Sequence, residues 1–364
     1  MADDGRIYVN ERGGRIRLIE NGELRADTLA EIPTTTAGET GLLGLTLSPD
    51  GNDLYAFATD PAGSFNRVLR VARTGGTPEI VVEDLPAELY HNGGGVAFAP
   101  DGSLLISNGE NHDTGLAQDP SELGGKVYRF TADGDVPDDN PFGDSPTYAL
   151  GLRNPYGMTI DPVSGAAFVT ENGPDAFDEV NRIDAGGNLG WPDISGPAGG
   201  ADTSGLEGDY ADPVADYPDI IVPTGIAFAD PKNAVREYAG DLFFGTYGQG
   251  AIHRLVLNEA RDGAVSDEVF VDEGEPVVAL AWGPEGLYYS TTSAVKVVPI
   301  ARSKRVGDET TPVTLSPAPR DGAATDPASD ERSDLVPRLI IFVLLAGAGF
   351  YFYRRGTTRR PPTP

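Results

Sequence analysis

A repeated pattern of short β-strands constrains this chain more than any other feature. An apolar, alternating run is followed by a tight turn containing Pro, Asp or Gly and then by a second apolar run. The repeats begin near residues 42, 95, 157, 225 and 279. Period-two alternation bounded by turn residues predicts β-hairpins. One such unit cannot bury both of its faces, so we expect the units to stack around an axis as the blades of a β-propeller.

The start of the chain carries only part of this unit. Segments 4–9 and 15–19 match the second and third strands of a blade, but no apolar first strand precedes them. We therefore predict an all-β fold, a six-bladed β-propeller over residues 1–302 whose first blade is incomplete at the N-terminus. Either the first inner strand, and a secretion signal with it, precedes this sequence, or the blade is naturally incomplete and the C-terminal segment fills the position.

Charge and cysteine content restrict the classes of partner. The chain has 56 acidic and 27 basic residues and a net charge of -29, so it repels phosphate backbones and nucleic acid is excluded as a partner. Only 4 of the basic residues are Lys, which indicates a halophilic protein. A GC-rich genome that favours Arg codons is the alternative. There is no Cys, so disulfides and thiol chemistry are impossible.

The composition changes after about residue 302. Residues 303–334 are rich in Pro, Ser, Thr, Asp and Ala, which predicts a disordered linker. Residues 335–353 are almost entirely apolar and predict one transmembrane helix if Arg338 reaches the interface. The tail, residues 354–364, is basic, which places the C-terminus in the cytoplasm and the propeller outside the cell membrane. A buried core helix is the alternative for 335–353.

Several polar motifs lie in glycine-rich turns between the predicted strands. Glycine lets the backbone approach a ligand closely, and His91 lies directly before such a run. In this order and spacing the motifs resemble the soluble aldose sugar dehydrogenase family (glucose/sorbosone dehydrogenases), which uses pyrroloquinoline quinone (PQQ) and calcium. The resemblance covers about residues 5–300. The motifs are 41–45, 91–94, 151–155, 171–174 and 187–192.

The resemblance implies a catalytic role for three residues. His91 matches the base that removes the proton of the anomeric hydroxyl, and an ordinary pKa near 6.5 suits that task. Glu110 stands where the family has an Asp that orients the base. Arg153 matches the cation that polarises the quinone carbonyl. Without the other motifs, the favoured interpretation of Arg153 is a strand-end turn in which it pairs with a carboxylate.

The resemblance also implies a cofactor site. Asn154 and Asn172 match residues beside PQQ, and Glu39 stands where a glutamine is expected. The carbonyls of Gly173 and Pro174 match the calcium ligands, in agreement with the preference of calcium for oxygen. On local chemistry alone, 172–174 is a turn.

The chain departs from the family at the groups that clamp the PQQ carboxylates. The expected Lys and two Arg fall on Gly248, Pro276 and Val278, and none of these residues carries positive charge. Each lost charge-assisted hydrogen bond is worth roughly 1.5–3 kcal/mol. Arg254 or Arg70 are the candidates to replace them.

Three functions therefore follow from the sequence. The first is a membrane-anchored, outward-facing aldose dehydrogenase that transfers a hydride from a sugar to PQQ and passes electrons to a respiratory acceptor. The second is a non-catalytic surface propeller that binds a glycan or a protein. The third is a calcium-dependent hydrolase such as a lactonase, with Glu39, Glu110 and Glu171 as candidate ligands.

Overall fold

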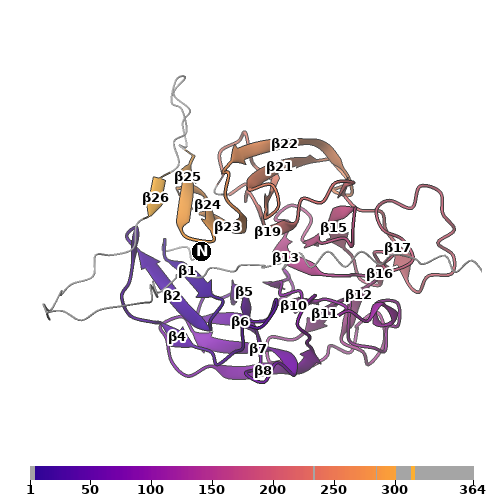
Figure 1. The fold of residues 1–364 in the computed structure, drawn as a ribbon, viewed down its shortest axis with the longest axis horizontal. Helices are drawn as coiled ribbons and strands as arrows, with labels where there is room; N and C mark the ends of the chain where they lie inside the picture. The colour runs from indigo at the N-terminus through magenta and orange to yellow at the C-terminus, as the bar shows by residue number, and fades with distance from the viewer. Residues whose placement is uncertain (1–4, 233, 284, 301–312, 316–364) are drawn as a thin grey trace, which may run out of the picture.

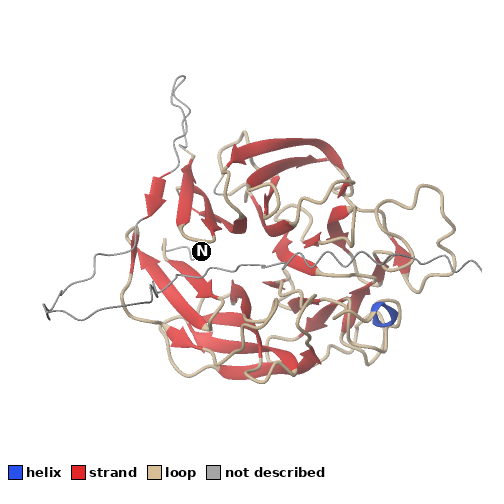
Figure 2. Ribbon diagram, viewed as in Figure 1, coloured by secondary structure: helices blue, strands red, loops and turns tan. Residues whose placement is uncertain are grey.

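The protein is described here by a computed structural model that covers residues 5–232, 234–283, 285–300 and 313–315. Strands and loops dominate these residues, and one short 3-10 helix, η1 (Thr114–Leu116), interrupts them (Figure 2). The predicted all-β propeller is confirmed. Among the described residues no helix is long and apolar enough to cross a membrane. The predicted transmembrane helix 335–353 and basic tail 354–364 lie outside the described residues.

The described strands form six sheets. The first contains β1 (Ile7–Glu11), β2 (Arg15–Glu20), β3 (Glu23–Leu24) and β4 (Ala30–Glu31), where both β3 and β4 pair with β2. The second contains β5 (Leu42–Leu47), β6 (Asp53–Thr59), β7 (Phe65–Ala72) and β8 (Glu79–Pro86) in that order. The third contains β9 (Val96–Phe98), β10 (Leu104–Asn108), β11 (Lys126–Phe130), β12 (Thr147–Leu150), β16 (Gly187–Asn188) and β17 (Asp209–Tyr210).

The remaining three sheets each have four strands. The fourth contains β13 (Pro155–Ile160), β14 (Ala167–Glu171), β15 (Asp178–Ile183) and β18 (Ala215–Tyr217). The fifth contains β19 (Pro223–Phe228), β20 (Leu242–Thr246), β21 (Ala251–Leu257) and β22 (Ala264–Asp272). The sixth contains β23 (Val277–Gly283), β24 (Gly286–Thr291), β25 (Val295–Pro299) and β26 (Val313–Leu315).

The sheets lie around a common centre (Figure 1). The inner strands β5, β9, β13, β19 and β23 follow one another side by side, and these are the first strands of the five hairpin repeats. The sixth sheet packs against the first through an apolar cluster, so side chains close the ring. Burial of each of these side chains stabilises the fold by about 1.5–3 kcal/mol. The cluster includes Ile7, Ile19, Val278, Tyr288, Val295 and Val297.

The N-terminal end of the propeller agrees with the predicted incomplete first blade, whereas the C-terminal segment differs from one of the two alternatives. Among the described residues β1 pairs with β2 alone, and it lies beside β5. The C-terminal strand β26 does not fill the inner position of the first sheet, because it pairs with the edge of β25 in the sixth sheet. Residues 313–315, expected within the disordered linker, are therefore part of the propeller. The physical reason is that β25 presents unpaired backbone groups at its edge, and a Val-Thr-Leu run has high β-propensity.

The sheet topology brings particular loops together. The inner strands β9 and β13 are antiparallel to the second strands of their sheets, so each begins at the end of the propeller where that second strand ends. The loop before β9 therefore meets the loop after β10, and the loop before β13 meets the end of β14. These loops carry the predicted site residues.

Candidate active site

His91 lies in the loop between β8 and β9 in a strained backbone conformation. Its φ is +57°, in the left-handed region, which costs a residue with a side chain roughly 1–2 kcal/mol. Two hydrogen bonds hold it there. The His91 backbone N–H donates to Glu39 Oε2 at 2.8 Å, and Asn111 Nδ2 donates to the His91 carbonyl at 3.1 Å. The position of the imidazole is therefore set by groups from two other loops.

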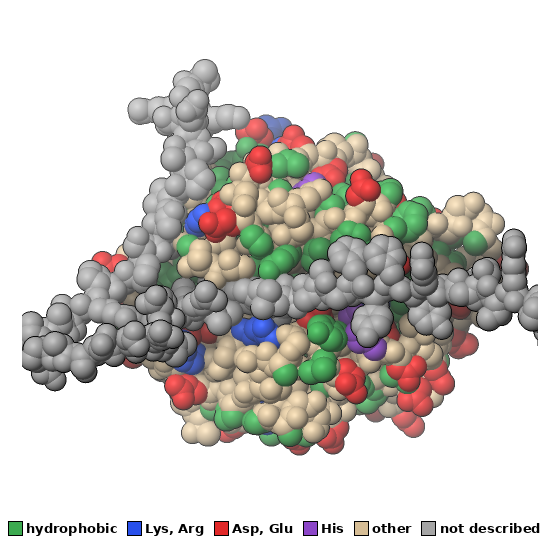
Figure 3. All heavy atoms as spheres, viewed as in Figure 1, with side chains coloured by type: hydrophobic (Ala, Val, Ile, Leu, Met, Phe, Trp, Pro, Cys, Tyr) green, Lys and Arg blue, Asp and Glu red, His purple; other side chains and the backbone are tan. Residues whose placement is uncertain are grey.

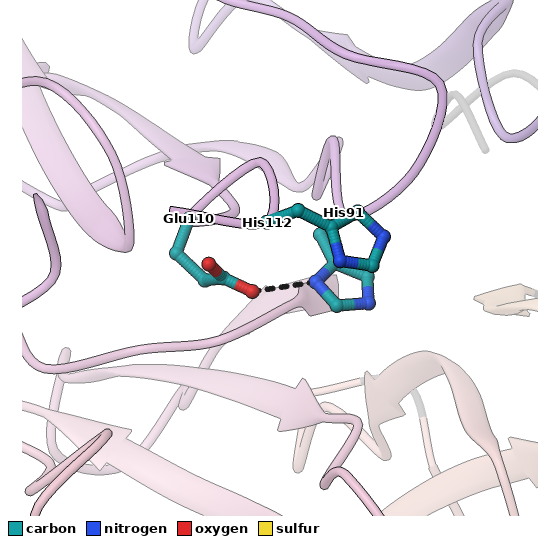
Figure 4. Close-up of side chains that lie close together, drawn as sticks. All are labelled: His91, Glu110 and His112. Atoms are coloured by element: carbon teal, nitrogen blue, oxygen red, sulfur yellow. Dashed lines mark hydrogen bonds and ion pairs between the residues drawn. The ribbon is translucent and has the colours of Figure 1, made fainter. Parts of the chain in front are cut away.

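Glu110 meets His91 because Gly109 allows the two loops to approach. A Cβ atom on Gly109 would lie 2.1 Å from the carbonyl oxygen of His91, so only glycine fits. His91 Nδ1 and Glu110 Oε1 are 2.6 Å apart (Figure 4). His91 is 7% exposed and Glu110 1% exposed. The structure thus brings together the residues predicted as the base and its orienting carboxylate.

Arg153 joins this pair through the backbone. The Glu110 N–H donates to the Arg153 carbonyl at 2.8 Å. In turn the backbone N–H groups of Arg153 and Asn154 donate to Glu171 Oε1, at 3.1 and 2.5 Å. One chain of hydrogen bonds therefore links loops of the third and fourth sheets and fixes Arg153 relative to Glu110.

The Arg153 side chain binds two backbone carbonyls. Its Nη1 donates to the carbonyls of Asn172 and Gly173 at 2.9 and 3.0 Å. These two oxygens converge on one cationic atom, as the ligands of a cation must. Of the predicted calcium pair, Gly173 and Pro174, the Gly173 carbonyl is one of the two oxygens that Arg153 binds, and Pro174 is exposed. The Arg153 guanidinium also lies 5.6 Å from the centre of the Trp191 ring.

A pocket opens beside Arg153. Two polar atoms on its walls, Glu171 Oε2 and Trp191 Nε1, are buried without a hydrogen-bond partner in the part of the chain that the structure describes. Unpaired buried polar atoms are costly, so both are suited to bind a polar ligand. The lining residues include Gly151, Arg153, Glu171, Gly173, Phe177, Glu179, Leu189, Trp191, Ile194 and Ser195.

The two asparagines predicted beside PQQ make protein contacts. Asn154 Oδ1 accepts a hydrogen bond from Gly93 N at 3.2 Å, so it supports the His91 loop. Asn172 Nδ2 donates to the Pro223 carbonyl at 3.3 Å, whereas Asn172 Oδ1 is buried with no partner among the described residues. Asn172 therefore keeps one group available to a ligand, and Asn154 acts mainly by positioning.

Burial sets the protonation of the site. It lowers the pKa of His91, although the hydrogen bond to Glu110 acts in the opposite direction. It raises the pKa of Glu39 above the usual value and that of Glu171 well above it. His91 is therefore neutral at pH 7, with Nδ1 held by Glu110 and Nε2 left to accept a proton. The neutral tautomer with hydrogen on Nδ1 is assigned from this contact.

Two neighbours of the site did not follow from the sequence. His112 stacks on His91 with ring centres 4.0 Å apart, and the Tyr90 ring meets the His112 ring edge-on. Arg12, from the first sheet, donates to the carbonyls of Thr36 and Thr40 and so holds the loop that carries Glu39. A usable signal for His112 was its position after β10, because the end of β10 meets the loop before β9 that carries His91. The contacts of Arg12 join the first sheet to the loop before the second sheet, and no sequence pattern indicated them.

The two arginines predicted to replace the carboxylate clamp pair with acidic residues, and the clamp position Val278 is apolar. Val278 is buried in the apolar cluster of the first and sixth sheets. Arg70 pairs with Glu79 and Asp133, and Arg254 pairs with Asp241 and Glu268.

Both arginines lie on third strands, β7 and β21, where carboxylates form ion pairs with them. The hypothesis that they substitute for the clamp is therefore wrong.

The face viewed in Figure 3 shows histidine side chains near its middle, with acidic side chains distributed around the rim.

The fold and the site together are those of a β-propeller whose loops place a histidine–carboxylate pair and an arginine at one end, as in an enzyme active site. The family profile described as Glucose / Sorbosone dehydrogenase matches residues 1–297, so the chain belongs to this family. Aldose sugar dehydrogenase YliI of Escherichia coli (strain K12) is 29% identical over 325 residues, which cover 80% of this chain and 85% of the relative.

Two solved structures share this fold over most of their length. The PQQ-bound form of aldose sugar dehydrogenase from Streptomyces coelicolor matches with a TM-score of 0.69 and 31% identity, over 85% of this chain and 90% of that one. The putative oxidoreductase (glucose dehydrogenase) from Thermus thermophilus matches with a TM-score of 0.69 and 35% identity, over 80% and 89%.

Proposed function

We propose that this protein is a membrane-anchored, outward-facing aldose dehydrogenase that oxidises the anomeric hydroxyl of a sugar, with PQQ and calcium as cofactors. The observation that carries the proposal is the 2.6 Å contact between His91 and Glu110 beside Arg153, in a chain of the glucose/sorbosone dehydrogenase family. The relatives named as aldose sugar dehydrogenases, one of them PQQ-bound, support the choice of substrate class and cofactor.

His91 acts as the general base. Its Nε2 takes the proton of the sugar's anomeric hydroxyl while the hydrogen on C1 leaves with its electron pair. Glu110 stabilises the imidazolium that forms, because its carboxylate already faces Nδ1 in a nearly dry environment. Such proton transfer contributes about 10²–10⁴-fold to the rate.

The residues present fit a polar, anionic group beside Arg153. Arg153 and Trp191 Nε1 supply donors at the pocket, and Trp191 Nε1 has no partner among the described residues, whereas the partnerless Asn172 Oδ1 can only accept a hydrogen bond. PQQ, when bound, supplies the acceptor for the two electrons and the hydrogen of C1. The carbonyls of Gly173 and Pro174 are the candidate calcium ligands, and the Gly173 carbonyl accepts a hydrogen bond from Arg153 Nη1.

The charge balance favours weak cofactor binding at low salt. Arg153 is accompanied by Glu39, Glu110 and Glu171, and the clamp positions are neutral. Salt screens the repulsion between Glu39 and an anionic ligand, which agrees with a halophilic protein.

Membrane anchoring and the outward orientation rest on the sequence. The apolar run 335–353 is followed by a basic tail, and the linker before it gives the propeller reach from the surface. Electrons then pass to a respiratory acceptor. Protease accessibility of the propeller in intact cells tests the orientation, and protection of the propeller contradicts it.

The enzymatic proposal is tested by reconstituting the full chain with PQQ and calcium and measuring dye reduction with a panel of aldoses. We expect sugar-dependent reduction that His91→Gln lowers at least about a hundredfold. The matched control is His253→Gln, because His253 also contacts a carboxylate, Asp267 at 2.9 Å, but lies on β21. Absence of activity with every aldose, with PQQ bound, refutes the proposal.

A further inference from the structure

Three potential metal ligands converge at one end of the propeller. One ring nitrogen each from His91 and His112 and a carboxylate oxygen of Glu110 lie within 4.8 Å of one another (Figure 4). Among the described residues this is the only group of three or more such side chains that could hold a metal ion. The chain has three histidines and no Cys, so few competing soft ligands exist.

A second observation points to a ligand at this cluster. Glu110 is 1% exposed, and its Oε2 is buried with no hydrogen-bond partner in the part of the chain that the structure describes. The carboxylate therefore has a lone pair to offer in addition to its contact with His91. Glu39, whose carboxylate accepts from the His91 backbone, adds negative charge nearby, whereas Arg153 opposes a cation.

The ligand types select a borderline metal ion. Two imidazole nitrogens and one carboxylate oxygen are ligands typical of zinc, whereas calcium prefers oxygen alone. Tetrahedral zinc with bonds near 2.1 Å places its ligand atoms about 3.4 Å apart, so the cluster must contract modestly. His112 can supply this movement because it is exposed and lies at the tip of a loop. Water would complete the shell.

We propose that His91, Glu110 and His112 form an inhibitory site for Zn²⁺ that blocks the catalytic base. If zinc binds Nε2 of His91, it occupies the lone pair that must accept the sugar's proton. If it binds Nδ1, the single hydrogen of the neutral ring must lie on Nε2, which again cannot accept. Either mode removes the base. The inhibitory consequence rests on the proposed dehydrogenase function, whereas zinc binding does not.

Binding is tested by calorimetric titration of the full, metal-free chain with Zn²⁺ in the absence of PQQ. We expect one site per chain, weakened roughly tenfold or more in His112→Ala and unaffected by Ca²⁺ competition. His253→Ala is the matched control and should retain the site. Circular dichroism of each variant confirms that it is folded. Equal zinc affinity in wild type and His112→Ala overturns the proposal.

Inhibition is then measured as the zinc concentration that halves the activity of each variant relative to its own zinc-free rate. We expect this concentration to rise roughly tenfold or more for His112→Ala and to stay unchanged for His253→Ala. Stoichiometric zinc binding without any loss of activity overturns the block of the base. A chain that binds zinc through His112 but oxidises no sugar supports the metal site and refutes only the dehydrogenase proposal.

Discussion

Replacing Glu110 with Gln tests the central pair of the site. The amide keeps the size of the side chain and can still accept from His91 Nδ1, so the geometry is preserved while the negative charge is removed. In the native protein the 2.6 Å contact lies between a 7% exposed imidazole and a 1% exposed carboxylate. Water therefore cannot compensate for the lost charge when His91 becomes protonated.

The size of the effect follows from the hydrogen bond. A bond to a charged partner contributes roughly 1.5–3 kcal/mol and a neutral bond roughly 0.5–1.5 kcal/mol. The difference, about 1–1.5 kcal/mol, applies to the protonated His91 of the transition state. At about 1.36 kcal/mol per tenfold change, kcat should fall roughly 5–13-fold.

The pH profile gives a second, independent readout. Burial lowers the pKa of His91, and the Glu110 hydrogen bond partly offsets this effect. Removing the carboxylate must therefore lower the pKa further. Since neutral His91 is the base, activity rises with pH through that pKa, and the acid limb of the Glu110→Gln profile should move to lower pH.

The assay is kcat and kcat/KM for dye-linked sugar oxidation between about pH 4 and 9, with PQQ and calcium saturating. Asp267→Asn is the control, because it makes the same change at the His253–Asp267 pair on β21 and β22. An acid limb that stays in place or moves to higher pH refutes the reasoning, even if kcat falls. A merely structural role would lower stability without moving that limb.

Three further changes test charge and burial elsewhere. Glu39→Gln should tighten PQQ binding about fivefold at low salt, because it removes about 1 kcal/mol of charge repulsion. At high salt the PQQ affinities of wild type and Glu39→Gln should become equal, because salt screens that repulsion. Equal affinities of the two proteins at low salt contradict this prediction. Asp161→Asn should lower the free energy of unfolding by about 3–5 kcal/mol in urea melts, since Asp161 makes two 2.9 Å contacts with Arg261 and is fully buried; a loss below about 1 kcal/mol contradicts it. Burial lowers the pKa of Lys126 from 10.5 to about 7, so between these pH values the unfolded chain binds the proton more tightly than the folded chain. The free energy of unfolding of wild type should therefore rise relative to that of Lys126→Met from pH 7 to 10. A difference between the two proteins that does not change with pH contradicts this prediction.

The sequence predicted the fold well because hairpin repeats are local. Alternation and turn residues lie within about fifteen residues of each other, so each repeat identifies one sheet without knowledge of the others. The outer strand β26 was different, because its partner β25 is separated from it by 13 residues that carry no strand pattern. Three residues of Val-Thr-Leu were too short a signal in a segment of linker composition.

For a related reason, the sequence predicted which residues form the site but not all of their contacts. His91, Glu110 and Arg153 lie in loops whose meeting follows from antiparallel topology, so their order along the chain suffices to place them at one end. The partners of Arg153 do not follow from that order. Its contact with the carbonyls of Asn172 and Gly173 depends on the side-chain path, and so does the stacking of His112 on His91.

Burial also changes the meaning of the acidic residues around the site. If Glu39 and Glu171 are both charged, they repel an anionic cofactor, and the site without its cationic clamp would not be expected to bind one. Desolvation raises the pKa of Glu171 well above the usual value, further than that of Glu39, so it is at Glu171 that the protonated form is most favoured.

A protonated Glu171 turns its partnerless Oε2 from a repelling oxygen into a hydrogen-bond donor beside Arg153 and Trp191. A protonated Glu171 therefore opposes an anionic group at this pocket less than a charged one would, at a site where the clamp positions supply no positive charge. The affinity of such a site depends on how completely the pocket excludes water, because water that reaches Glu171 restores its charge.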